Sequence, residues 1–219
     1  MHQQIMNKKP VAPSLGKLDV NRMTGQEPFR LDDRRLDATL LEFWQWSSSD
    51  LVGNTLRGVL AEYIVGLALG CLDHVRVEWD AVDLCWRCDQ DRVIRIEVKS
   101  TSYLQTWKQP KTSKPKFNIK KKQSPEPPLD GDQPQPKRAA DVYVFCLFDN
   151  GDHEDKTKLD PLDLGHWSFY VLSTKSLERA FGNQKSVSLK PLEDVHGTSF
   201  PFPDLKSRVL AAANWCLPS

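Results

Sequence analysis

The sequence predicts an α/β domain, and three observations favour this fold class. Helical and extended patterns are interleaved, with two helical segments before the strands and two after them. Residues 141–148 are almost continuously apolar and rich in β-formers, as in a strand buried on both faces of a sheet. Residues 54–69 are apolar on nearly every side, as in a helix packed against a sheet. A chain of 219 residues has room for one sizeable core, so we expect a single domain over 31–219.

Composition and the N-terminus indicate a cytoplasmic protein. Hydrophobic residues make up 39% of the chain and charged residues 27%, which is ordinary for a globular protein. Because the apolar runs fall well short of the 18 or more residues of a membrane helix, we expect no membrane partner. The basic pair near the N-terminus is not followed by an apolar segment, so residues 1–30 are predicted to be a disordered tail and not a signal peptide.

Five cysteines without a secretory signal favour reduced thiols. Cys85 and Cys88 have a C-x-x-C spacing, but a second pair of zinc ligands at a matching spacing is missing from the sequence. We therefore favour ordinary packing for these thiols over a zinc or redox role.

Periodicity predicts each element in order. An amphipathic helix is expected over 36–46, because its apolar residues recur at helical spacing, and Ser47 to Asp50 can end it and cap the next helix. A proline-rich, basic insertion at about 105–140 cannot build a core, apart from a short strand within 116–122. The other predicted elements are a helix at 54–69, strands at 75–79, 82–86, 93–100, 141–148, 167–172 and 186–189, and helices at 173–181 and 203–215.

The hairpin over 83–99 carries two acids and a lysine. A turn centred on Gln90 places residues whose numbers sum to about 180 opposite each other, so Asp83 faces Glu97 with Cβ atoms roughly 5 Å apart. Glu97 and Lys99 share a face, since side chains repeat every second residue. Facing carboxylates repel, whereas Mg²⁺ favours converging oxygen ligands. Asp80 is a rival first acid, but it would lie opposite Ser100, past the lysine. A solvated strand face is the alternative for Glu97 and Lys99.

Glu62 is the exception in the apolar helix at 54–69, because an ionised carboxylate there is costly unless it is paired. Two interpretations stay open. Glu62 forms a salt bridge or lies at the solvent edge of the helix, or it reaches toward Asp83 and Glu97.

A basic segment follows the hairpin. Seven lysines and no acid lie between 108 and 122, which favours contacts with phosphates, although a solvated linker is the alternative for any one lysine. Residues that continue from the strand can also contact a nucleic-acid backbone or stack on a base. The predicted nucleic-acid-binding residues are Ser100, Tyr103, Gln105, Lys116, Lys120, Lys121 and Lys122.

Together, the buried helix with Glu62, the hairpin with Asp83, the Glu97-x-Lys99 pair and the central apolar strand resemble the core of the PD-(D/E)XK, or restriction-endonuclease-like, nuclease superfamily. The resemblance covers about 54–148 and implies a mixed central β-sheet flanked by helices. It equates Asp83 with the first acid, Glu97 with the second, Lys99 with the lysine and Glu62 with the helix glutamate. The sequence departs from the pattern at Val82, where the family motif has proline.

The resemblance implies Mg²⁺-dependent hydrolysis of phosphodiester bonds, with Mn²⁺ able to substitute. Asp83, Glu97 and the Val98 carbonyl would hold the ion, Glu62 would hold a second ion or a water, and Lys99 would orient or deprotonate the water. The expected partner is nucleic acid, DNA before RNA, and a homodimer would suit paired cuts in a duplex. The alternative is a catalytically inactive nucleic-acid-binding or interaction module on the same fold.

Overall fold

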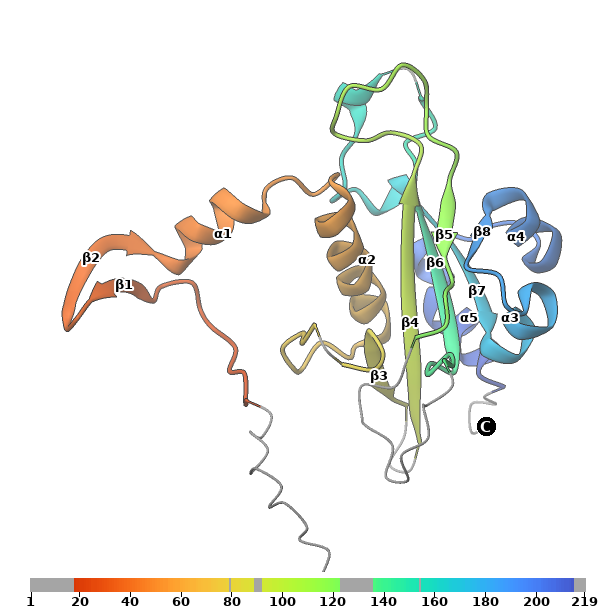
Figure 1. Ribbon diagram of the computed structural model, residues 1–219, viewed down its shortest axis with the longest axis horizontal. Helices are drawn as coiled ribbons and strands as arrows, with labels where there is room; N and C mark the ends of the chain where they lie inside the picture. Colours follow the sequence, from red (N-terminus) through yellow and green to blue (C-terminus); the bar gives the residue numbers. More distant parts are fainter. Residues whose placement is uncertain (1–17, 79, 89–91, 123–135, 154, 215–219) are drawn as a thin grey trace, which may run out of the picture.

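The core of the protein is a four-stranded sheet of mixed orientation with strand order β3-β4-β6-β7 (Figure 1). The structure is a computed structural model that describes residues 18–78, 80–88, 92–122, 136–153 and 155–214. β3 is antiparallel to β4, β4 is parallel to β6, and β6 is antiparallel to β7. These strands are β3 (Leu84–Arg87), β4 (Val93–Ser102), β6 (Val142–Phe148) and β7 (Trp167–Ser173). The predicted α/β class with a mixed central sheet flanked by helices is therefore confirmed.

Two layers of helices cover the two faces of this sheet, because alternate side chains of each strand point to opposite faces. α2 (Asn54–Leu69) and α5 (Leu205–Ala212) share one hydrophobic cluster with Ile96 and Val98 of β4. The other face carries Tyr143 and Phe145 of β6. It is covered by α3 (Thr174–Phe181), α4 (Leu189–His196) and the small sheet of β5 (Lys116–Asn118) and β8 (Ser186–Ser188).

β6 is the central strand that its apolar sequence predicted. All seven of its residues are buried, as expected for a strand with a covering layer on each face. The predicted helix at 54–69 has the expected bounds and ends at Gly70, which has a φ of 69° and so adopts the left-handed conformation common after a helix.

The N-terminal part of the chain forms an arm, residues 18–48, that projects from the body of the protein (Figure 1). A hairpin of β1 (Pro28–Leu31) and β2 (Arg34–Thr39) leads into α1 (Leu40–Ser48). β1 begins within the predicted tail, of which residues 1–17 lie outside the described residues. The helix predicted over 36–46 begins later because Thr39 and Glu42 form a capping box.

Three further differences concern loops and short helices. Among the described residues 75–78 there is no strand, because an alternating pattern forms one only where a partner strand pairs with it. α4 was not predicted, and the last helix is shorter than expected, following a 3₁₀ turn at Phe202–Asp204. Within the described residues, every helix is too short or too polar to cross a membrane.

Candidate active site

The hairpin register brings Asp83 and Glu97 opposite each other. β3 and β4 pair Leu84 with Ile96 and Cys85 with Arg95, so the next pair in the same register is Asp83 with Glu97, as predicted. Asp83 lies just before β3, and its Oδ2 accepts a hydrogen bond of 2.7 Å from the Val98 amide. Because the N–H and C=O of one strand residue point to the same side, the Val98 carbonyl also faces this end of the hairpin. The turn at 89–91 lies outside the described residues.

Two ammonium groups converge on the two carboxylates. Lys99 Nζ lies 2.6 Å from Glu97 Oε1 and 3.7 Å from Asp83 Oδ2. Lys122 Nζ lies 2.7 Å from the same Glu97 oxygen. The Glu97 side chain is only 4% exposed, so its charge depends on these partners. The structure thus brings together Asp83, Glu97 and Lys99 as predicted, and it adds Lys122, which the sequence suggested only as a phosphate contact.

Burial and the neighbouring acid shape the electrostatics of the cluster. Burial raises the pKa of Asp83; the Lys99 ammonium opposes this rise and the Glu97 charge adds to it. Burial by itself would lower the pKa of Lys122, but the hydrogen bond to Glu97 and the charges of Glu97, Asp83 and Glu62 together raise that pKa. The pKa of Tyr143 is also raised, by burial and then by the Glu97 charge. The site therefore holds two neighbouring negative charges, which the ammonium groups of Lys99 and Lys122 offset.

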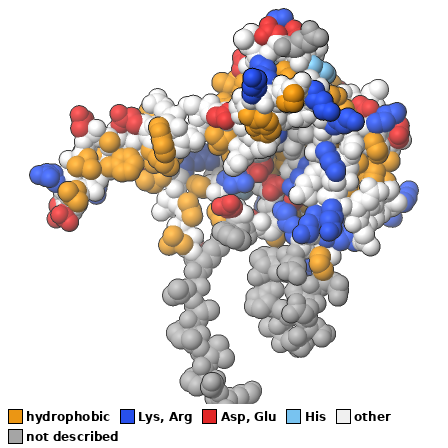
Figure 2. Space-filling view, turned by 45° about the horizontal axis from the view of Figure 1, so that its top comes forward, with side chains coloured by type: hydrophobic (Ala, Val, Ile, Leu, Met, Phe, Trp, Pro, Cys, Tyr) orange, Lys and Arg blue, Asp and Glu red, His pale blue; other side chains and the backbone are white. Residues whose placement is uncertain are grey.

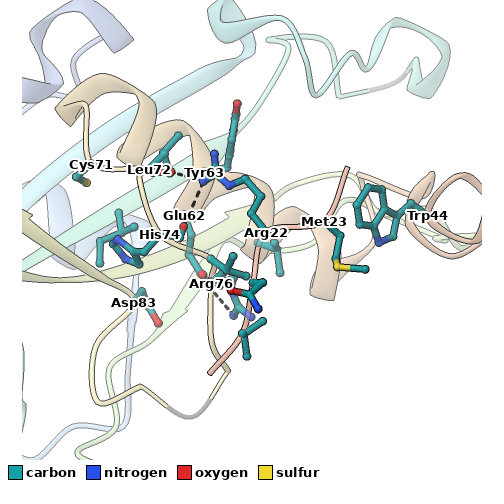
Figure 3. Close-up of a pocket in the computed structure, with 15 residues that line it drawn as sticks. Arg22, Met23, Trp44, Glu62, Tyr63, Cys71, Leu72, His74, Arg76 and Asp83 are labelled. Carbon is teal, nitrogen blue, oxygen red and sulfur yellow. Dashed lines mark hydrogen bonds and ion pairs between the residues drawn. The ribbon is translucent and has the colours of Figure 1, made fainter. Parts of the chain in front are cut away.

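Glu62 forms the salt bridge that was one of its two interpretations. Arg76 donates to both Glu62 oxygens, and the Nη2 to Oε1 distance is 3.1 Å (Figure 3). α2 packs on the sheet face that carries Ile96 and Val98, whereas Glu97 points to the opposite face. Glu62 and Glu97 thus approach the hairpin from different sides. The Glu62 charge still contributes to the raised pKa of Asp83.

The basic segment forms a cavity beside the cluster, which we call the lysine pocket. Its volume is about 590 Å³. It is lined by Lys99, Asn118, Lys120, Lys121, Lys122 and Pro136. Lys121 also contacts Glu178 at 3.4 Å, while Lys120 and Lys116 are exposed. Figure 2 shows Lys and Arg side chains gathered on the body of the protein, with others at the tip of the arm. Lys120, Lys121 and Lys122 thus line one cavity next to Glu97, whereas Lys116 lies outside it, with its backbone amide hydrogen-bonded to Thr101.

The predicted contacts beyond the lysines are less available. Gln105 is buried, and its amide accepts from Arg57 and donates to the Ser102 carbonyl, both at 3.1 Å. We correct its predicted role in nucleic-acid binding to a structural one, because its hydrogen-bonding groups are already used. Tyr103 stacks on His153 with ring centroids 4.1 Å apart. Ser100 is half-buried on β4.

A second cavity, which we call the aromatic pocket, was not predicted. It has a volume of about 380 Å³ and lies between the arm, α2 and the loop after α2 (Figure 3). Its walls include Met23, Trp44, Glu62, Tyr63, Leu72 and Asp83. The apolar residues of the predicted helix at 36–46, which include Trp44, could have indicated this pocket. Their spacing, however, is the same as that of a helix face packed on a core.

The pair of Asp83 and Glu97 fits a magnesium ion. Within the described part of the chain, no three acidic, imidazole or thiol side chains converge as a metal-binding group. Mg²⁺ in phosphoryl-transfer sites, however, uses one or two carboxylates and takes its other ligands from water and phosphate. Both carboxylates already contact one cation, the Lys99 ammonium. Two carboxylates and a strand carbonyl are therefore a sufficient donor set for Mg²⁺ or Mn²⁺.

Comparison with known proteins gave no relative: no family profile, curated protein or solved structure matches this chain.

Proposed function

We propose that the protein is a metal-dependent nuclease that hydrolyses phosphodiester bonds in nucleic acid, DNA before RNA, on a restriction-endonuclease-like core. The observation that carries the proposal is the pair of facing carboxylates, Asp83 and Glu97, which share one ammonium contact beside the lysine pocket. Two carboxylates that face each other across a strand pair repel and so do not stabilise the fold. A site that binds a metal cation and a phosphate, in contrast, uses such a pair of carboxylates as ligands.

Asp83, Glu97 and the Val98 carbonyl would hold the ion. When bound, Mg²⁺ supplies a Lewis acid for the scissile phosphate and lowers the pKa of a coordinated water. Lys99 has its ammonium at the centre of the cluster, where it can orient the attacking water and offset charge that develops on the phosphate. Lys122 holds Glu97 in place before substrate binds, and its exposed stem lets it turn to a phosphate afterwards. Glu62 as a further ligand stays a prediction, because Arg76 occupies it.

The test is cleavage of supercoiled plasmid, single-stranded DNA and structured RNA with Mg²⁺, Mn²⁺ or EDTA. Wild type should cut with either ion and not with EDTA. Glu97→Gln should lose about 100-fold or more in rate, because Lewis-acid stabilisation is worth several kcal/mol. The control is Asp194→Asn, an exposed carboxylate on α4 that is also paired with a lysine, Lys190. Cleavage that survives EDTA, or equal rates for wild type and Glu97→Gln, would refute the metal site.

One observation favours a second function, a nucleic-acid-binding module without turnover. Glu97 is already neutralised by Lys99 and Lys122, so the cluster is electrostatically balanced in the absence of a metal. If nucleic acid binds but is not cut under any of these conditions, this function replaces the first. The predicted homodimer, which would suit paired cuts in a duplex, is tested by the ratio of linear to nicked plasmid and by sedimentation.

A further inference from the structure

The aromatic pocket and the lysine pocket lie on opposite faces of the sheet, and the residues that link them are Asp83, in the wall of the first, and Lys99, in the wall of the second. The aromatic pocket is bounded by Val59, Glu62 and Tyr63 of α2. Other residues of the same helix, such as Ala61 and Val65, pack on the face of Ile96 and Val98. Lys99 belongs to the other face. Asp83 lines the aromatic pocket, and its Oδ2 lies 3.7 Å from Lys99 Nζ, which lines the lysine pocket. A ligand held at Asp83 can therefore reach both cavities.

The walls of the aromatic pocket are held in place by contacts from the arm. Arg22 donates to the carbonyls of Leu72 and His74, which ties the arm to the loop after α2. Gly25 lies against the Trp44 ring: a Cβ at this position would come within 3.2 Å of the ring atom Cζ3. Gly25 also has a φ of 90°, which disfavours a side chain. One side of the indole thus packs against the backbone at Gly25.

The pocket offers flat apolar surfaces and a polar edge. Trp44 is 37% exposed and Tyr63 54% exposed, so their rings are accessible to a ligand. At the other side, the ion pair of Glu62 and Arg76 supplies hydrogen-bond acceptors and donors (Figure 3). A nucleobase has the same composition, two apolar faces and a polar edge. A volume of about 380 Å³ is also within the range of small-molecule pockets.

We propose that the aromatic pocket receives one unstacked base of the nucleic-acid strand whose phosphate lies at Asp83 and Glu97. The inference rests on the proposed function and adds a substrate preference to it. The charged backbone follows the lysine pocket, whereas the base turns into the apolar cavity. Substrates with an unpaired base at the cleavage position are preferred to a continuous duplex, because the duplex must first be unstacked at a cost of a few kcal/mol.

The experiment scans abasic sites through single-stranded DNA of roughly 20 nucleotides, longer than typical single-strand sites. Wild-type protein should cleave about 10-fold more slowly when the abasic site occupies one or two positions next to the cut, because stacking of a base on an aromatic ring is worth ~1–3 kcal/mol. Trp44→Ala should slow cleavage of the intact strand by a similar factor and should be insensitive to the abasic site. Trp46→Ala is the matched control: it is on the same helix, is 84% exposed, and is not part of the pocket wall.

The outcomes separate this inference from the proposed function. Metal-dependent cleavage that is equal at every abasic position would overturn the base pocket and leave the nuclease intact. If no substrate is cut, anisotropy of labelled intact and abasic strands gives the answer: base-dependent affinity that Trp44→Ala removes supports the pocket without hydrolysis, and equal affinities or no binding overturn it. Tyr63→Ser is a second wall variant in case Trp44→Ala disturbs the arm. If the rate or affinity depends on the base only after removal of residues 1–17, the N-terminal tail competes for the pocket, and the inference fails for the full chain.

Discussion

The lysine pocket and the aromatic pocket differ in chemistry although the wall of one contains Asp83 and the wall of the other contains its ion-pair partner Lys99. The first is lined by four lysines and lies on the sheet face covered by β5 and α3. The second is lined largely by apolar side chains and lies on the face covered by α2. A strand of nucleic acid has the same division, because its backbone is charged and its bases are flat and apolar. The two faces are separated by the sheet, and Asp83, at the edge before β3, lies close to residues of both.

The two pockets also differ in how the fold supports them. Lys99 lies on β4, next to the fully buried strand β6, so its backbone is fixed by the core. Trp44 lies on α1, which has no buried residues. The aromatic pocket therefore depends on a few contacts between arm and body, such as those of Arg22.

The largest expected effect is for substitution of Asp83, which lies between the two pockets. Asp83→Asn should reduce cleavage about 100-fold or more on every substrate, because a metal ligand is lost. The metal-free protein should become more stable, by about 1 kcal/mol. Burial raises the pKa of Asp83, so the ionised side chain is less favourable in the folded state than in the unfolded chain, and asparagine can still accept from the Val98 amide. Activity assays and thermal unfolding measure the two effects.

Asp80→Asn provides the control for that substitution, since Asp80 is the rival acid of the sequence. It should leave cleavage unchanged. A loss of activity in Asp80→Asn with normal activity in Asp83→Asn would move the metal site and separate it from both pockets.

Changes in the lysine pocket should alter the salt dependence of binding. Replacing Lys120, Lys121 and Lys122 together by alanine should flatten the plot of log affinity against log salt by up to about 2 units, because each phosphate contact contributes ~0.7–0.9. We expect less than the full effect of three lysines, since Lys121 and Lys122 already contact Glu178 and Glu97. Titration of labelled DNA at several salt concentrations measures the slope.

Lys190→Ala is the comparison variant for the slope, because Lys190 is an exposed lysine on α4 outside the lysine pocket. Its slope should equal that of wild type. If the triple variant also keeps the wild-type slope, the lysine pocket does not bind the backbone.

Metal binding should depend on pH through Asp83. Its folded pKa is raised above the ordinary value of 3.8, so protons compete with Mg²⁺ as the pH falls through the raised value. Below that value the Mg²⁺ affinity should fall up to about tenfold per pH unit for one proton displaced. The same shift means that the metal-free protein loses stability as the pH rises from 3.8 through the folded pKa. Calorimetric titration of Mg²⁺ at a series of pH values tests this, and a pH-independent affinity over the acidic range would contradict it.

The smallest effect is expected at Glu62. Because Glu62 is bound by Arg76 and approaches from the α2 face, Glu62→Gln should lower the cleavage rate by less than ~10-fold, as for a positioning residue. Single-turnover rates with Mg²⁺ measure it. A loss comparable to that of Asp83→Asn would instead return Glu62 to the metal site and show that the two faces are joined more closely than we infer.

The local parts of the site were predictable from the sequence. The hairpin register follows from a period of two and a turn of known position, so Asp83, Glu97 and Lys99 came together as expected. The buried helix and the central strand were predictable too, because continuous apolar sequence has few alternatives to burial. The same reasoning failed for Trp44. An apolar stripe predicts that a helix packs against a core, but α1 has no buried residues.

The sequence by itself determined the α/β class, the buried strand β6 and the facing acids, because these depend on side-chain period and on residues close together in the chain. Tertiary structure decided the rest. It paired Glu62 with Arg76, brought Lys122 to Glu97 from 25 residues further along the chain, and placed the arm against α2. Contacts of this kind depend on which face of the sheet each layer covers, and periodicity alone does not specify that. The two pockets, and the ion pair of Asp83 and Lys99 that links their walls, exist because helices and the small sheet cover the central sheet in this arrangement.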